Sequence, residues 1–413
     1  MTGEVSSVWS DGRAGSRAPG LRFVDATMLH ATAARPVHGV PLFVGFGRLR
    51  RAVAWHPVGA ALEFRHWEQF RDWIDPLPGG FLGAAVAGFF ANGGTHCAVV
   101  PVMFGHGPSD LIASFRAGGP LEDIGGVDRL CVPDAVLHCD RSDAALREIH
   151  AAAVAHCEAM GERLAILDAL QGPETGGGRP DDARIAAVTG QSHWLKSRFG
   201  ALYFPWLTID GRSSGHAHGR RVPPCGHVAG LYARTDARIG VHKAPANERL
   251  EGTTALECEV DGEQHGRLND AGVNCIRSSA AMGTRVWGAR TLSGQSDWLY
   301  VPVSRLFLAL TGWLKHQVDD LVFETHTPEL WRRVHRRLSG YCLDLMNAGA
   351  LASMDAASAF FVKCDSENNP PASRDAGQLV ADVGLAPSAP AEFVVVRITH
   401  GANGIAVNGL QPA

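Results

Sequence analysis

The strongest constraint on the fold is the alternation of short apolar runs, typical of strands, with longer runs that have helical spacing. Residues 40–46 form a short apolar run bounded by glycines, as expected of a buried strand. Residues 80–90 are apolar on nearly all sides and end at Asn92-Gly93-Gly94, which predicts a buried helix with a glycine stop. A β-rich run over 97–103 follows. Because helices and strands alternate along most of the chain, the sequence predicts an α/β fold.

Further elements follow the same pattern. Apolar residues at helical spacing, some with a cap or a proline at the start, predict helices over 63–74, 143–160, 181–198, 223–237, 304–318 and 328–347. Short apolar runs predict strands over 164–167, 201–209, 284–292, 321–324, 359–363, 379–385 and 392–399.

Turn-forming residues divide the chain into segments. The predicted order begins with an N-terminal arm and linking strand (1–25) and an N-terminal portion (26–221). A C-terminal domain (222–400) and a tail (401–413) follow. Within the N-terminal portion, two stretches rich in Gly and Pro are predicted to be surface excursions, near 104–126 and 172–180.

Composition excludes several classes of protein. The chain has 413 residues, of which 46% are hydrophobic and 19% charged, as in ordinary globular proteins. A formal net charge of −4 argues against a nucleic-acid protein with a broad basic surface. The nine cysteines form no C-x-x-C pair, which favours reduced, buried thiols in a cytosolic protein. The polar start and the short apolar runs predict no secretory signal and no membrane insertion.

Motifs that carry chemistry are nearly absent from the sequence. No G-x-G-x-x-G, no G-x-x-x-x-G-K-[ST] and no G-x-S-x-G occurs. His216-Ala217-His218 offers two imidazoles without a third metal ligand nearby, and is interpreted as a polar loop. The run Cys364–Asn369 lacks the glycine and the terminal Glu of a calcium loop. We therefore assign no catalytic, cofactor-binding or metal-binding residue, and expect no cofactor.

The sharpest charge feature is a basic segment inside the predicted helix 328–347. Leu330, Val334 and Leu338 lie on one face at helical spacing. The arginines fall mainly on the opposite side, at Arg332, Arg333, Arg336 and Arg337. A solvated face and contact with an acidic partner protein both fit this pattern. Nucleic-acid binding fits less well, because no second basic cluster accompanies the helix.

Several phrases resemble one known family. They include the runs Val222–Asp236 (VPPCGHVAGLYARTD), Val241–Asn247 (VHKAPAN), Leu268–Arg277 (LNDAGVNCIR) and Val286–Leu292 (VWGARTL). In this order and spacing they resemble the tail-sheath proteins of contractile phages and extracellular contractile injection systems. Phe89–Gly94 is similar to a signature in the N-terminal half of that family. The chain departs from the family pattern at Cys225, Ser304-Arg305, Thr325-His326 and Asp25.

The resemblance implies a mixed sheet with flanking helices and extended N- and C-terminal arms. Subunits of this family stack as six-fold rings around an inner tube and contract, with arms that add strands to a neighbour's sheet. The matching strand residues here are Leu21, Phe23, Glu392, Phe393, Val395 and Arg397. The four arginines of the basic helix would contact the tube. Implied partners are further copies of the chain, an inner tube protein, and baseplate and terminator or cap proteins.

The resemblance also implies assembly in the cytoplasm and later incorporation into a phage tail or an injection particle. It implies a structural protein, not an enzyme, and neither nucleic acid nor membrane as a direct partner. Two alternatives stay open on the residues alone: a hydrolase-like α/β enzyme, and another self-assembling shell or baseplate component.

Overall fold

The computed structural model describes residues 39–50, 61–103, 105, 107–138, 143–172, 178–210, 219–317, 324–388, 394–401 and 404–410. The predicted arm at residues 1–25 lies outside these residues, as does most of the predicted strand 321–324. Side chains of residues 394–410 are not described.

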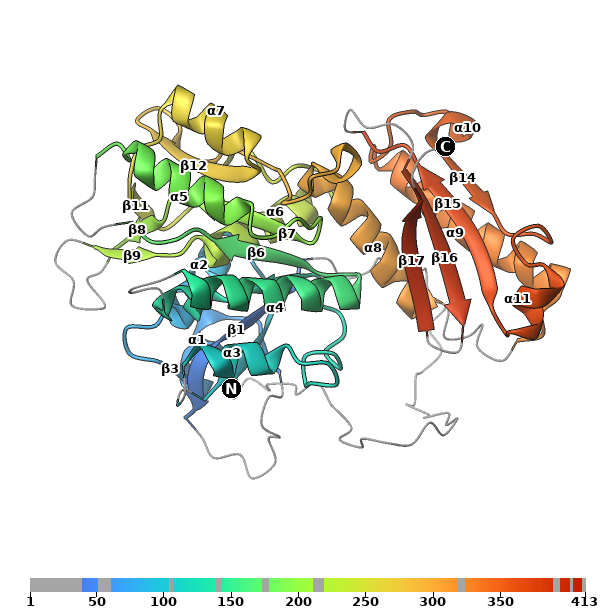
Figure 1. The fold of residues 1–413 in the computed structure, drawn as a ribbon, viewed down its shortest axis with the longest axis horizontal. Helices are drawn as coiled ribbons and strands as arrows, with labels where there is room; N and C mark the ends of the chain where they lie inside the picture. Colours follow the sequence, from blue (N-terminus) through green and yellow to red (C-terminus); the bar gives the residue numbers. More distant parts are fainter. Residues whose placement is uncertain are drawn as a thin grey trace.

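A ten-stranded mixed sheet forms the larger lobe of the molecule (Figure 1). Along the sheet, the strands are β10 (Glu248–Arg249), β13 (Gly283–Val286), β12 (Val273–Ser279), β7 (Gly200–Phe204), β6 (Leu164–Asp168), β5 (Arg129–Cys131), β1 (Pro41–Leu49), β4 (Cys97–Val102) and β2 (Leu62–Phe64), with β3 (Ile74–Pro76) beside β1. The six strands from β12 to β4 are parallel, and the outer strands are antiparallel. The central strands β6 and β7 are buried along their whole length because both faces of the sheet are covered.

Helices cover the two faces of this sheet. Helices α3 (Pro108–Ser114), α4 (Ala144–Met160) and α5 (Asp182–Ser192) lie on the face turned toward the viewer in Figure 1, and α2 (Leu82–Ala91) and α6 (Cys225–Arg238) lie behind it. The larger lobe also holds α1 (Trp67–Trp73), α7 (Gly262–Asp270), the 3₁₀ helix η1 (Pro133–His138) and a small sheet of β8 (Leu207–Ile209), β9 (Arg220–Val222) and β11 (Thr253–Leu256).

Helices α2 and α6 approach each other unusually closely. A Cβ added at Gly226 would overlap the backbone of Ala85, and one at Gly230 would overlap the backbone of Phe89. On the facing helix, a Cβ at Gly88 would collide with the His227 ring. The glycines are therefore required because they let the two backbones meet without side chains between them.

A second, smaller lobe has its own core (Figure 1). Helix α8 (Val301–Gln317) follows the 3₁₀ helix η3 (Ser296–Trp298) and leads into this lobe. There, α9 (Pro328–Asn347) packs on an antiparallel sheet in the order β14 (Phe360–Lys363), β15 (Leu379–Leu385), β16 (Val394–Gly401) and β17 (Gly404–Leu410). Two short helices, α10 (Ala356–Ala359) and α11 (Pro371–Asp375), complete it.

The α/β class and the mixed sheet with flanking helices are confirmed. The structure differs from the predicted elements in a few places. The strand expected over 201–209 is two strands, β7 and β8, interrupted at Pro205-Trp206. The helix expected over 63–74 is the shorter α1 between β2 and β3. Residues 401–413, expected to be a tail, contain strand β17, in which Ile405 and Val407 alternate with small residues.

The structure describes only part of each of the two predicted surface excursions. In segment 104–126, Leu111 and Phe115 of the α3 region are buried in the main core. Segment 172–180 falls partly outside the described residues.

Candidate assembly surfaces

The basic helix α9 is anchored by its apolar stripe. Thr327 caps the helix by accepting a hydrogen bond from the Leu330 backbone N–H at 3.3 Å. The buried residues repeat three or four positions apart and pack into the second core: Leu330, Trp331, Val334, Leu338, Cys342 and Met346. The packing fixes which side of α9 faces outward.

The four arginines of α9 divide into two pairs with different surroundings. Arg333 pairs with Glu324 at 3.0 Å, and Arg337 donates to the Gln317 carbonyl at 2.9 Å. Arg332 and Arg336 are exposed, one helical turn apart. The pair at 333 and 337 is therefore engaged within the chain, and the pair at 332 and 336 projects toward solvent.

The predicted C-terminal assembly strand is held inside the chain's own sheet. Val395 lies opposite Gly384 on one side and Leu410 on the other. Arg397 likewise lies in register with β15 and β17. Glu392 and Phe393, like Leu21 and Phe23, lie outside the described residues. Within the described part of the sheet, β14 and β17 each have a strand on one side only, so these two edges can accept a further strand.

A buried charge cluster joins α8 to the large sheet. Arg305 of α8 and Arg129 of β5 both bind the Asp236 carboxylate of α6, at 2.9 Å for Arg305 Nη1 and 2.9 Å for Arg129 Nη2. Asp128 adds a second carboxylate 2.9 Å from Arg129. The Arg129 and Arg305 side chains are 0% and 4% exposed. Two cations and two anions balance, so the cluster avoids an uncompensated buried charge.

Tyr232 lies against this cluster. Its ring centroid is 4.7 Å from the Arg305 guanidinium carbon and 5.5 Å from that of Arg129. Burial alone would lower the pKa of Arg305, but Asp236 and Asp128 together raise that pKa above its ordinary value. Arg305 is therefore a permanent cation that fastens α8 to α6.

Other buried carboxylates hold backbone groups. Asp134 accepts from the Phe46 N–H at 2.7 Å and from the Phe81 N–H at 2.5 Å. Asp168 accepts from the Cys225 N–H at the start of α6 at 2.8 Å. Burial raises the pKa of Asp168 to about 7. These structural hydrogen bonds occupy the carboxyl groups at the starts of α2 and α6 and along β1.

Metal and nucleophile chemistry finds no support in the part of the chain that the structure describes. No group of three or more His, Cys, Asp or Glu side chains could hold a metal there. The eight described cysteines are free and buried. The loop His216-Ala217-His218 lies outside the described residues. Among the described helices, none has the length and apolar character that crossing a membrane requires.

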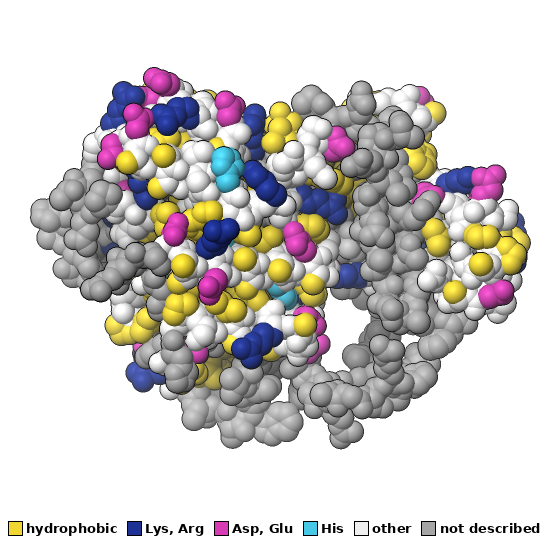
Figure 2. All heavy atoms as spheres, viewed as in Figure 1, with side chains coloured by type: hydrophobic (Ala, Val, Ile, Leu, Met, Phe, Trp, Pro, Cys, Tyr) yellow, Lys and Arg dark blue, Asp and Glu magenta, His cyan; other side chains and the backbone are white. Residues whose placement is uncertain are grey.

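Surface charge is also mixed on the face that Figure 2 presents. Basic and acidic side chains are interspersed over that face of the larger lobe, so no broad basic area appears there. This distribution agrees with the near-neutral net charge of the chain.

Comparison with known proteins identifies the family. The profile of the phage tail sheath protein central domain matches residues 128–292. A chain in the helical sheath of the anti-feeding prophage, in its contracted state, is 26% identical, with a TM-score of 0.69 over 92% of this chain and 98% of that chain. Residues 128–292 of this chain form a tail-sheath domain. The tail-sheath resemblance noted in the sequence is thereby confirmed.

Other relatives agree with this assignment of a tail-sheath protein. A chain in the contracted sheath complex of an extracellular contractile injection system, PVC, is 26% identical, with a TM-score of 0.66 over 95% of this chain and 99% of that chain. A chain in the six-fold symmetrised baseplate of the anti-feeding prophage is 25% identical, with a TM-score of 0.70 over 92% of this chain and 97% of that chain.

A putative prophage major tail sheath protein of Pseudomonas aeruginosa (strain UCBPP-PA14) is 28% identical over 208 residues. That match spans 48% of this chain and 50% of the relative, so the chain matches about half the length of this curated protein.

Sequence reasoning did not find the buried charge cluster. Its four residues come from three distant parts of the chain and show no common spacing. The one local signal was Ser304-Arg305, where the family usually has two arginines. Arg305 is the residue that binds Asp236.

Proposed function

We propose that this chain is a structural subunit of a contractile sheath, which polymerises as stacked six-fold rings around an inner tube and contracts to drive that tube through a target envelope. The observation that carries the proposal is the nearly full-length match to a chain of a helical sheath in its contracted state. Self-association and association with a baseplate are supported by the sheath and baseplate assemblies in which the related chains occur.

The two lobes suit a machine that moves by rearranging rigid bodies. Each lobe has its own core, and the charge cluster anchors α8 between them. A contractile polymer needs two packings of the same subunits, with links that survive rotation of the bodies. Main-chain hydrogen bonds between added strands provide such links because they do not depend on side-chain fit.

The edges of the four-stranded sheet are the proposed places for these links. An arm strand from a neighbouring copy, containing Leu21 and Phe23, adds at the β14 or β17 edge. The C-terminal strand with Glu392, Phe393, Val395 and Arg397 takes part in the same link. Repetition of this head-to-tail contact generates a helical polymer.

Contact with the inner tube is assigned to α9. Its exposed Arg332 and Arg336 face outward, whereas Arg333 and Arg337 are engaged within the chain. An acidic tube surface would pair with the outward arginines in the extended form. Terminator or cap proteins complete the particle, which assembles in the cytoplasm.

The proposal includes no catalytic activity. The contractile stroke needs no nucleotide, since the energy is stored in the extended packing of the subunits. The buried acids, such as Asp134 and Asp168, are occupied by backbone hydrogen bonds. No observation on the described residues favours the hydrolase alternative.

The test is assembly. The full chain is produced alone and together with its neighbouring tube protein, and each sample is viewed by negative-stain electron microscopy. We expect hollow tubes or cogwheel sleeves with six-fold end views. Dispersed monomers in both samples, at concentrations where related polymers form, would contradict the sheath function.

A further inference from the structure

The hairpin formed by β12 and β13 carries a row of like charges. Arg277 lies directly opposite Arg285, and Arg285 lies directly opposite Arg249 of β10. Residues directly opposite each other share a face of the sheet, and like charges in that arrangement are destabilising. The row therefore concentrates positive charge on one face of the hairpin, which favours an acidic partner wherever the chain itself leaves an arginine unpaired.

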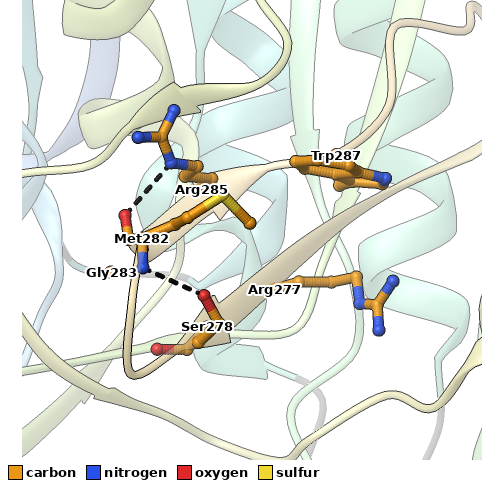
Figure 3. Close-up of a pocket in the computed structure, with 7 residues that line it drawn as sticks. Arg277, Ser278, Met282, Gly283, Arg285 and Trp287 are labelled. Carbon is orange, nitrogen blue, oxygen red and sulfur yellow. Dashed lines mark hydrogen bonds between the residues drawn. The ribbon is translucent and has the colours of Figure 1, made fainter.

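One of these arginines has no partner within the described chain. Arg285 donates to the Met282 carbonyl at 3.0 Å and to the Asn247 carbonyl at 2.6 Å, and Arg249 lies 3.5 Å from Glu251. Arg277 makes no hydrogen bond or ion pair with another described residue. Figure 3 shows its side chain extended away from the hairpin turn, on the same side as Trp287.

A small pocket adjoins Arg277. Its volume is about 150 Å³, and it is lined by Arg277, Ser278, Ser279, Met282, Gly283, Arg285 and Trp287. Met282 and Trp287 are 47% and 37% exposed. This volume is below the roughly 300 Å³ of the smaller cofactor sites and suits one side chain. Apolar rims with a central cation are typical of anchor points between proteins.

The same chain offers a complementary acidic surface. Glu122 and Asp123 are exposed side by side in the turn 116–126, six and seven positions after the exposed Arg116, and neither forms an ion pair with another described residue. Arg163, just before β6, holds this turn through the Leu121 carbonyl at 2.8 Å. Because β5, β6, β7 and β12 are parallel, the turn before β5 and the hairpin after β12 lie at opposite ends of the sheet.

We propose that the Arg277 pocket of one subunit binds the acidic turn 116–126 of the next copy of this chain. The surfaces differ and lie at opposite ends, so the contact is heterologous and repeats along a helical polymer. This inference rests on the proposed sheath function and adds a body-to-body contact to the arm links. Opposite charges set the register of the contact, and the Trp287 rim excludes water from it.

Charge exchange tests the pairing. The variants are Arg277→Glu, the double variant Glu122→Lys with Asp123→Lys, and their combination, each in the full chain and assembled both alone and with its tube protein. We expect Arg277→Glu alone, and the double lysine variant alone, each to raise the critical concentration for tube formation roughly tenfold, since like charges then face each other. The combination should return it to within about twofold of the wild type. Arg147→Glu, on the exposed side of α4, is the control and should assemble normally.

Three outcomes would overturn the inference: normal assembly of Arg277→Glu, no recovery in the combined variant, or impairment only when the tube protein is present. The third would place the tube in the pocket. Equal melting temperatures of the monomers exclude misfolding. Failure of the wild type itself to form tubes would instead contradict the proposed function.

Discussion

At the scale of single residues, Arg305 is the most consequential side chain in the molecule. It is almost fully buried and shares the Asp236 carboxylate with Arg129. Breaking one side of a buried ion pair costs far more than the pair contributes, because the remaining charge stays in a poorly polarisable environment.

Replacing Arg305 with Met should therefore lower the free energy of unfolding by roughly 3–5 kcal/mol. Chemical denaturation of the purified monomer measures the change. Arg374→Met is the control: this arginine is exposed on α11, and its loss should change stability by less than about 0.5 kcal/mol. Similar stability of the two variants would show that the cluster is not an anchor.

Variants of the two arginine pairs of α9 should affect different properties, one pair assembly and the other stability. Charge reversal of Arg332 and Arg336 should reduce sheath assembly on the tube but leave the monomer as stable as the wild type, because both side chains are exposed. Reversal of Arg333 and Arg337 should lower the melting temperature, because Glu324 and the Gln317 carbonyl lose their partners. Sheath length by electron microscopy and thermal denaturation distinguish the two. Sheaths of normal length from the first variant would remove the tube contact from α9.

Asp168 makes a prediction about pH. Its pKa is raised by burial to about 7, above the value of about 3.9 in an unfolded chain. The folded state therefore binds more protons, and this group's contribution to stability is lost as pH rises through 7. Asp168→Asn keeps an acceptor for the Cys225 N–H and cannot ionise.

Between pH 5 and pH 8 the wild type should lose roughly 2 kcal/mol relative to Asp168→Asn. Burial lowers the pKa of histidines such as His227 to about 4, which makes stability rise with pH. Wild type and variant share these histidines, so their contribution cancels when the two stabilities are subtracted. Urea midpoints at the two pH values give the result, and parallel pH profiles would contradict it.

At the scale of elements, the α2–α6 contact depends on missing side chains. Gly226→Ala should lower the free energy of unfolding by about 2–4 kcal/mol, because the new Cβ meets the Ala85 backbone, which cannot move aside cheaply. Gly340→Ala on α9 is the matched control. No atom lies within 4 Å of its added Cβ, so it should stabilise the protein by about 0.5–1 kcal/mol. Calorimetry of both variants makes the comparison, and a stable Gly226→Ala would refute the close packing.

The sequence predicts elements with a strong local pattern and misses those defined by distant partners. Helix α9 has the predicted bounds 328–347, since Thr327, Pro328 and a regular apolar stripe mark it. Strand β12 was not predicted: its outer end, Arg277-Ser278-Ser279, is polar, and its pairing with β7 depends on residues far away in the chain. The strand predicted over 284–292 ends earlier, at Val286, where the register with β12 stops. Beyond it, Trp287 still donates its N–H to the Cys275 carbonyl at 2.7 Å.

The candidate assembly residues show the same limit. Helical spacing placed the arginines of α9 on one side, but could not show that Glu324 and the Gln317 carbonyl engage two of them. The Arg277 pocket was also missed. Its row of arginines exists only because β10, β13 and β12 stand side by side in one register.

At the scale of the whole molecule, the arm and the body should be separable. Deletion of residues 1–25 should leave the melting temperature of the monomer within about 2 °C of the wild type, because the described residues of both cores all lie at position 40 or later. The same deletion should abolish tube formation, since the linking strand with Leu21 and Phe23 is lost. Tubes of normal length from the truncated chain would show that the links lie elsewhere.

Helix α8 also has a mechanical consequence. Its 17 residues span about 25 Å, and Arg305 near its start is clamped in the larger lobe while its later turns enter the core of the smaller one. A rod held at one end amplifies small rotations. Turning the helix by about 15° at Arg305 would move its far end, about 18 Å away, through roughly 5 Å, a displacement of the size at which packed interfaces change partners. The displacement between the two lobes for each degree of rotation would then be set by the length of one helix.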